Sequence, residues 1–169
     1  MKKILKFLLV FMVITSCKDN NSYDLDEVAI VNDIFRTVLD DGALVSENDI
    51  KIVLDNYLRS LKTEDLSNIK ASDLYLGYDV EKEKENAQLD VGQITNVGNY
   101  DIVASEPEKG KSAKVHFSRV YFNQSKEKGI LIFEIFCGEY CYEKKIITVK
   151  KDVGSGKWTI IDTNTLEVA

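Results

Sequence analysis

Apolar residues recur at helical spacing in one segment near the start of the chain. Between Asp26 and Leu39 they follow one another at intervals of three and four residues, which places them in one stripe on an α-helix. The stripe consists of Val28, Val31, Ile34, Phe35, Val38 and Leu39. Gly42 follows two aspartates and can adopt the left-handed conformation that ends a helix. The pattern therefore predicts a helix over residues 26–39 with one buried face.

The segment 49–59 fits two patterns. Ile50, Ile52 and Leu54 recur at every second position, as in a strand, but the same segment also suits one apolar face of a helix. We favour a strand over residues 50–55 and keep the helix as the alternative.

Residues 62–99 are mostly polar. The alternating charges of residues 81–85 lie in the middle of this stretch, and such a run is typical of a solvated surface. We therefore expect a solvated helix turn or loop there rather than a binding site.

From Tyr100 onward, short runs of β-forming residues alternate with turn-forming clusters. The runs predict strands at 100–105, 113–122, 129–137, 141–150 and 157–162. Their connections are too short for crossover helices, so we expect an antiparallel meander of about five strands. The run 129–137 is apolar on both faces apart from Glu134, which predicts a central strand that the N-terminal helix covers on one side. The expected fold class is therefore α+β.

Two cysteines flank a short turn in this second half. Residues 138–140 form the predicted hairpin loop, so Cys137 and Cys141 should face each other at a separation that a disulfide tolerates. The same register places Glu134 opposite Lys144, which predicts an ion pair.

A redox-active pair and a zinc site with His116 are the alternatives for these cysteines. The spacing is C-x-x-x-C rather than C-x-x-C, and zinc would find at most three ligands. We therefore expect a structural disulfide, and we predict no metal site and no cofactor.

The start of the chain carries a targeting pattern. Lysines precede an apolar run over residues 7–14, which is too short to span a membrane, and small residues then precede Cys17. This is the pattern of a secretory signal, and the position of the cysteine resembles a bacterial lipobox. We expect 1–16 to be a signal peptide, 17–25 a lipidated cysteine with a flexible tether, and 26–169 a single α+β domain.

The lipobox resemblance implies a place in the cell. Lipoproteins of this kind carry a diacylglycerol and an acyl chain on the cysteine, and two or more chains anchor a protein stably. Cys17 would hold the protein in the outer membrane, facing the periplasm or the cell surface. Removal of residues 1–16 leaves 19 basic against 28 acidic residues, a formal charge of −9. That charge disfavours nucleic-acid binding, which needs clustered Lys and Arg.

A second resemblance covers about the last 55 residues. It rests on Phe117-Ser118-Arg119, on Phe122-Asn123, on the Cys137-Gly138 hairpin with Cys141, and on Gly156-Lys157-Trp158. These motifs resemble a pattern in small, uncharacterised Bacteroidota cell-envelope lipoproteins, from which the chain departs at Tyr142, where those proteins usually carry glycine. The resemblance implies a fold and carries no activity.

Three residues of the strand 113–122 are the candidates for ligand binding. Strand alternation places His116 and Ser118 on one face, with Val120 and Phe122, and Arg119 on the other. A dyad of Ser118 with His116 lacks a nucleophile elbow, and Arg119 could clamp a carboxylate or pair with a local acid. We assign no catalytic residue.

The chemistry of these candidates leaves three hypotheses for function. The first is a non-catalytic binding or assembly module that binds an envelope protein partner or an extracytoplasmic ligand. The second is a small extracytoplasmic hydrolase or thiol enzyme. The third is an immunity-type protective lipoprotein.

Overall fold

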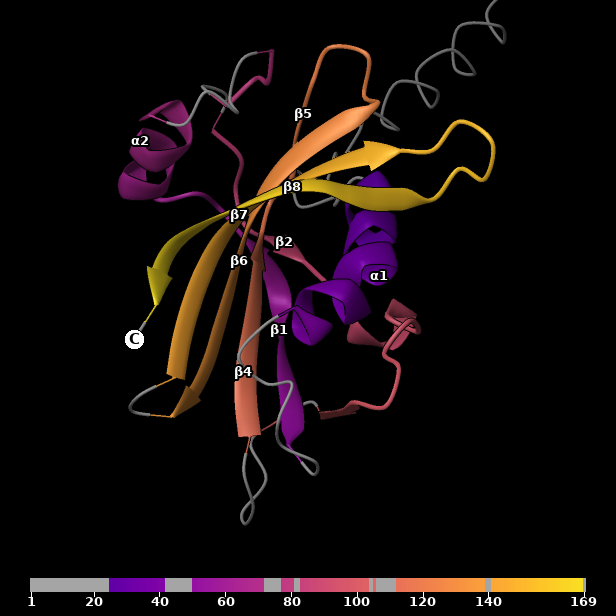
Figure 1. Cartoon of the computed structure of the whole chain (residues 1–169), viewed down its shortest axis with the longest axis vertical. Coiled ribbons are helices and arrows are strands. Elements are labelled where there is room, and N and C mark those ends of the chain that lie inside the picture. The colour runs from indigo at the N-terminus through magenta and orange to yellow at the C-terminus, as the bar shows by residue number, and fades with distance from the viewer. Residues whose placement is uncertain are drawn as a thin grey trace, which may run out of the picture.

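The computed structural model describes residues 25–41, 50–71, 77–80, 83–103, 105, 112–138 and 141–168. Within them an N-terminal helix packs on a twisted, mixed and mostly antiparallel sheet (Figure 1). The elements are α1 (Leu25–Asp40), β1 (Lys51–Arg59), α2 (Thr63–Ala71), β2 (Ala87–Gln88), the 3-10 helix η2 (Val91–Gln93), β3 (Asp101–Val103), β4 (Ser112–Ser118), β5 (Tyr121–Phe122), β6 (Lys128–Gly138), β7 (Cys141–Lys151) and β8 (Trp158–Val168). The predicted α+β class is confirmed. Cys17 and its flanking segments lie outside the described residues.

The strands follow the order β2-β1-β4-β6-β7-β8, with β3 beside β1 and β5 beside β6. The predicted meander is confirmed for β4, β6, β7 and β8, which pair antiparallel in succession. The first strand of the predicted meander, 100–105, was wrongly placed, because β3 pairs in parallel with β1 and not with β4. Strand β1 also adds to β4 in parallel, which the prediction did not include. A parallel neighbour requires a long connection, and residues 60–111 provide it.

Helix α1 covers one face of the sheet with the predicted apolar stripe. Ile34, Phe35 and Leu39 are almost fully buried against strand residues such as Phe117 and Phe133. The rings of Phe35 and Phe117 lie 6.2 Å apart, and those of Phe117 and Phe133 lie 5.4 Å apart. This packing forms the main core of the fold.

Helix α2 covers part of the opposite face, where the sequence predicted only a solvated segment. Ile69 is fully buried and packs with Ile130, Ile132 and Ile146 of the central strands. Leu66 is the other apolar contact from α2. The helix was missed because two apolar residues are too few to show a helical period.

Strand β6 is central and buried on both faces over residues 129–135, as predicted. The edge strand β8, which pairs with β7, continues to Val168, six residues beyond the predicted end at 162. Most of its side chains are exposed, so the sequence beyond Ile161 is polar and did not look like a strand. Two irregularities in its pairing with β7 interrupt the edge.

Candidate functional site

A bulge in β1 gathers charged residues on the face of the sheet opposite α1. Leu54 pairs with Val115 and Leu58 with Phe117, so four steps along β1 match two steps along β4. Four residues of a regular strand span about 13 Å, and the bulge shortens that distance. Asp55 and Arg59 can therefore both reach His116 on β4.

His116 lies between the two β1 side chains. Its Nδ1 is 3.0 Å from Oδ2 of Asp55, and its Nε2 is 3.4 Å from Nη2 of Arg59. Arg59 also donates from Nε to the same Asp55 oxygen at 2.7 Å. Because a guanidinium can only donate, Nε2 of His116 must accept, and the imidazole is neutral with its proton on Nδ1.

The surroundings of His116 favour this neutral form. Burial lowers the pKa of His116, and the charge of Arg59 lowers it further. Asp55 and Glu134 act in the opposite direction, and the net effect on the pKa is a decrease. The imidazole therefore carries no charge at neutral pH.

Acidification should test this state of His116. An unfolded histidine has a pKa near 6.5, so between that value and the lower folded pKa the unfolded chain binds more protons. The stability that neutral His116 contributes is present above about pH 6.5 and is lost as the pH falls through the folded pKa. We expect the melting temperature of the wild type minus that of His116→Gln to decrease from pH 8 to pH 5. His116 is the only histidine of the chain, so NMR of the untagged protein measures its pKa directly.

A larger difference at pH 5 than at pH 8 would contradict the neutral assignment. It would mean that a charged imidazole pairs with Asp55 in the folded protein.

A second charged group lies beside the first on the same face. Lys144 contacts Asp65 of α2, and its Nζ is 3.3 Å from Oε1 of Glu134. Glu134 and Lys144 are direct cross-strand partners, so the predicted pair is confirmed. Burial alone lowers the pKa of Lys144, but Asp65 and Glu134 outweigh it, and the net shift of the pKa is upward. Lys144 is therefore a charged group held between two carboxylates.

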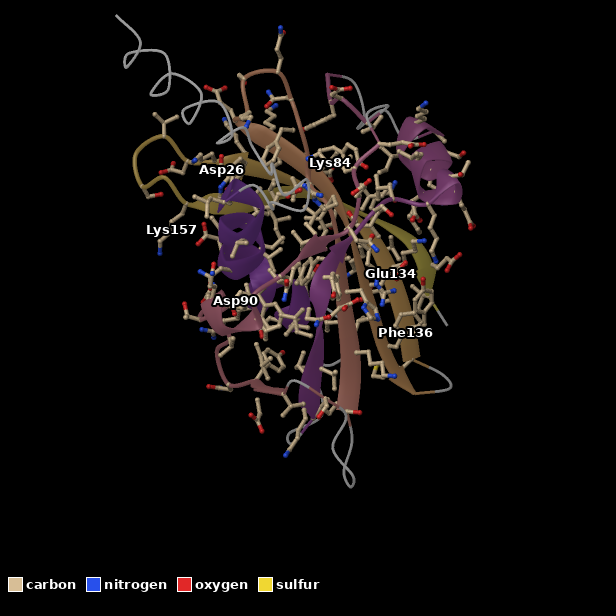
Figure 2. The ribbon with its side chains drawn as sticks, turned by 180° about the vertical axis from the view of Figure 1, so that it is seen from behind. Asp26, Lys84, Asp90, Glu134, Phe136 and Lys157 are labelled. Carbon is tan, nitrogen blue, oxygen red and sulfur yellow. A yellow bond between two sulfur atoms is a disulfide. The ribbon has the colours of Figure 1, made fainter. Side chains whose placement is uncertain are left out.

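Aromatic side chains border these charges toward the β6 and β7 hairpin. The rings of Phe136 and His116 meet edge to face at 5.7 Å, and Phe136 lies 4.5 Å from the ring of Tyr142. Burial and, to a lesser extent, Glu134 raise the pKa of Tyr142 to about 12, so the phenol stays neutral. Figure 2 shows Glu134 and Phe136 one after the other along β6.

The charged face opens on a pocket of about 300 Å³. Its charged and polar lining consists of Asp55, Asn56, Arg59, Lys114 and His116, and Val91 of η2 contributes to one wall. Polar groups from β1 and β4 thus converge on one concavity, the usual form of a small-molecule site.

The hydroxyl of Ser118 forms hydrogen bonds with two backbone groups. Its hydroxyl donates to the carbonyl of Arg119 at 2.9 Å and accepts from the amide of Ile132 at 2.8 Å. Both ring nitrogens of His116 have other partners. The structure therefore does not bring Ser118 and His116 together as a dyad.

Because of a bulge between β4 and β5, the side chains after Ser118 lie on the opposite faces of the sheet from those predicted. Val120 and Phe122 pack in the main core under α1, whereas Tyr121 packs in the cluster on the α2 side. Simple alternation predicted the reverse, with Val120 and Phe122 beside His116. The residues from Ser118 to Val120 form an irregular step, after which the side chains exchange faces.

Arg119 pairs with a local acid, which is one of the two roles that the sequence analysis gave it. Its Nη2 is 2.9 Å from Oε2 of Glu27, a fully buried carboxylate in the first turn of α1. Glu27 also accepts from the amide of Val120 at 2.8 Å, and Lys84 approaches it at 3.5 Å. Arg119 is 8% exposed, so it is not a binding residue of the open face.

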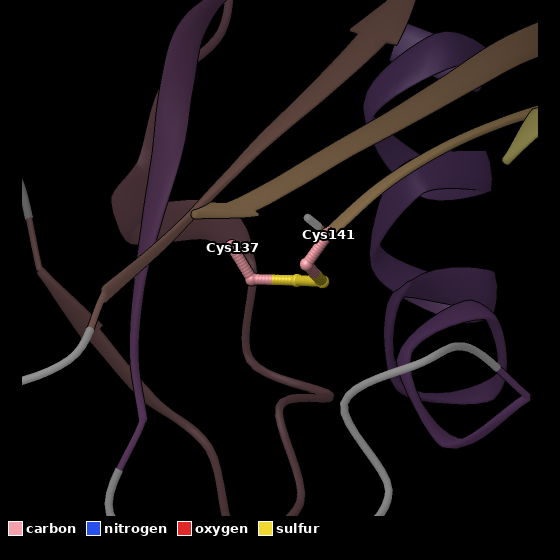
Figure 3. Close-up of a disulfide and its surroundings, with 2 residues drawn as sticks. All are labelled: Cys137 and Cys141. Carbon is pink, nitrogen blue, oxygen red and sulfur yellow. A yellow bond between two sulfur atoms is a disulfide. The ribbon is translucent and has the colours of Figure 1, made fainter. Parts of the chain in front are cut away.

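The cysteines are joined as predicted, but in a different register. Cys137 and Cys141 form a disulfide with a Cα–Cα distance of 5.0 Å (Figure 3). Gly138, not Cys137, pairs with Cys141, so Cys137 lies in an irregular step and the loop is shorter than predicted. A positive φ of 129° at Gly138 makes the step possible.

Asp55, Arg59 and Lys114 are the site residues that the sequence analysis missed, and Asp55 and Arg59 come from a different strand than His116. Their four-residue spacing suggests the face of a helix, and only their pairing with β4 reveals the bulge that joins them to His116. A local signal was absent, because the partner strand lies about 60 residues further along the chain.

Metal binding and a membrane-spanning helix find no support in the described residues. No group of three or more His, Cys, Asp and Glu side chains there could hold a metal ion. No helix within the same residues is long and apolar enough to cross a membrane.

Comparison with known proteins yields no matching family model, no matching curated protein and no matching solved structure.

Proposed function

We propose that this protein is a non-catalytic binding module of the cell envelope. The single observation that carries the proposal is the convergence of Asp55, Arg59, Lys114 and His116 on one open pocket. The lipobox pattern at Cys17 supports a lipid anchor in the outer membrane, with the domain facing the periplasm or the cell surface. The anchored module would present the pocket to its ligand.

The contacts of the candidate nucleophiles make an enzyme the weaker hypothesis. The hydroxyl of Ser118 already holds two backbone groups, and Cys137 and Cys141 are joined to each other. A hydrolase or thiol mechanism would have to free one of these groups first. An immunity-type lipoprotein would also act by binding, so it is a special case of the same proposal.

Affinity capture from native envelopes tests the proposal. The lipidated wild type is compared with Arg59→Gln, which removes one positive charge from the pocket, and with Cys17→Ala, which removes the anchor. The matched control is Arg36→Gln on the other side of the molecule, where Arg36 makes an exposed pair with Asp40. Crosslinked proteins and copurifying small molecules are identified by mass spectrometry.

We expect the wild type and Arg36→Gln to recover the same ligand or partner, and Arg59→Gln to recover much less of it. Loss with Cys17→Ala as well would mean that the partner is met only at the membrane. Equal recovery by wild type and Arg59→Gln, or recovery of nothing but lipid, would contradict the proposal.

A further inference from the structure

The guanidinium of Arg59 is fixed along one edge and open along the other. Nε donates to Asp55 and Nη2 faces His116, and these two nitrogens lie on the same edge of the guanidinium. No hydrogen bond or ion pair joins Nη1 to any of the described residues. The side chain is 43% exposed, so its outer pair of N–H groups faces solvent at the pocket.

This arrangement prepares Arg59 to bind an anion. A planar fork of two N–H groups matches the two oxygens of a carboxylate. The contacts with Asp55 and His116 hold the fork in place before a ligand arrives, which reduces the entropy lost on binding.

The charge of the pocket lining suits a single negative charge. Asp55 already carries one negative charge beside Arg59, and His116 is neutral. A carboxylate adds only one further negative charge to this group. A dianionic phosphate would keep an excess negative charge beside the Asp55 carboxylate, which costs energy.

An exposed aromatic ring lies next to the charged lining. Phe136 is the cross-strand partner of Lys114, and 39% of Phe136 is exposed. Its contact with His116 connects it to the edge of the pocket. An apolar group of a ligand could cover this ring while its anionic end meets Arg59.

We propose that the pocket binds a carboxylate attached to a flat apolar group, with the carboxylate on the outer fork of Arg59 and the flat group against Phe136. The inference rests on the proposed function and names the chemical class of its ligand.

Benzoate is the probe, and benzamide is its neutral counterpart with the same ring. Each is titrated into the isotope-labelled mature domain in low-salt buffer, because counter-ions screen a half-exposed site. NMR shifts of the backbone and of the aromatic side chains report the location. The variants are Arg59→Gln, Phe136→Ala and the matched control Arg36→Gln.

We expect benzoate to shift the signals of Lys114, His116 and Phe136, with an affinity on the order of 1 mM for so small a ligand. Arg59→Gln should weaken this binding about tenfold, and Arg36→Gln should leave it unchanged. Phe136→Ala should weaken benzoate and benzamide to the same degree.

Three results would overturn the inference. These are equal binding of benzamide and benzoate, binding that survives Arg59→Gln, and the absence of shifts at this face. If envelope capture still depends on Arg59, only the carboxylate assignment fails and the binding module stands. If capture also shows no dependence on Arg59, both fail.

Discussion

Replacement of Glu27 by glutamine should lower the free energy of unfolding by about 3–5 kcal/mol, the usual cost of leaving one partner of a buried ion pair alone. Glu27 is fully buried, and its two oxygens accept from the Arg119 guanidinium and from the amide of Val120. Glutamine keeps the size of the side chain and removes its charge. Arg119 would then remain buried without an anion. Chemical denaturation of the mature domain measures the difference.

Asp26→Asn is the matched control, because it makes the same change one residue earlier in α1. Asp26 pairs with Lys151 at 3.0 Å, and about a third of each side chain is exposed. Surface pairs of this kind contribute up to about 1 kcal/mol, so the control should lose little stability. A loss below about 1 kcal/mol in Glu27→Gln would contradict the structural role assigned to Glu27.

A double variant separates charge from packing. Glu27→Leu with Arg119→Met removes both charges, and such apolar replacements of a buried pair are often neutral or stabilising. We expect the double variant to be more stable than either single variant. If the losses of the two single variants simply add, the two side chains do not act as a pair.

The bulges of β1 and β4 connect this buried pair to the open face. The amide of Arg119 donates to the carbonyl of Arg59 at 2.7 Å, so the irregular steps of the two strands are joined. Glu27 binds the irregular step after β4 from the α1 side, through the amide of Val120. The side chain of Arg59 extends from the end of β1 to the pocket on the other face. The backbone that positions Arg59 is thus stabilised from the opposite face of the sheet.

The parts of the fold that the sequence predicted have a regular pattern of burial. The stripe of α1 and the two-sided burial of β6 repeat at the helix and strand periods, and both lie where they were expected. The pairing of Glu134 with Lys144 was also predicted, and the irregular step between Phe136 and Gly138 preserves it although the hairpin pairs differently than expected. Short-range patterns such as these depend little on the rest of the fold.

The parts that were missed depend on contacts between distant segments. The parallel pairing of β1 with β4 joins segments that are about 60 residues apart, and the exchange of faces after Ser118 comes from a bulge, which leaves no mark in the hydrophobic pattern. For the same reason, the sequence predicted only part of the candidate site. His116 was identified, but Asp55 and Arg59 join it only through the pairing of two strands.

Replacement of Lys144 by methionine should have an effect of similar size to the loss of Glu27, about 3–5 kcal/mol at neutral pH. Lys144 is 5% exposed and lies between Asp65 and Glu134. Methionine fills most of the same space and removes the only charge that separates the two carboxylates among the described residues. Lys150→Met, on the exposed end of the same strand, is the control and should change stability little.

The pH dependence of this variant distinguishes electrostatics from packing. Without Lys144, the carboxylates of Asp65 and Glu134 lose the cation that both contact, so one of them should bind a proton more readily in the folded state than in the unfolded state. A folded pKa above the unfolded value means that stability falls as the pH rises through that range. The loss caused by Lys144→Met should therefore be smaller at pH 5 than at pH 8. An equal loss at both values would show that Lys144 contributes by packing alone, and would contradict its role as the shared cation of Asp65 and Glu134.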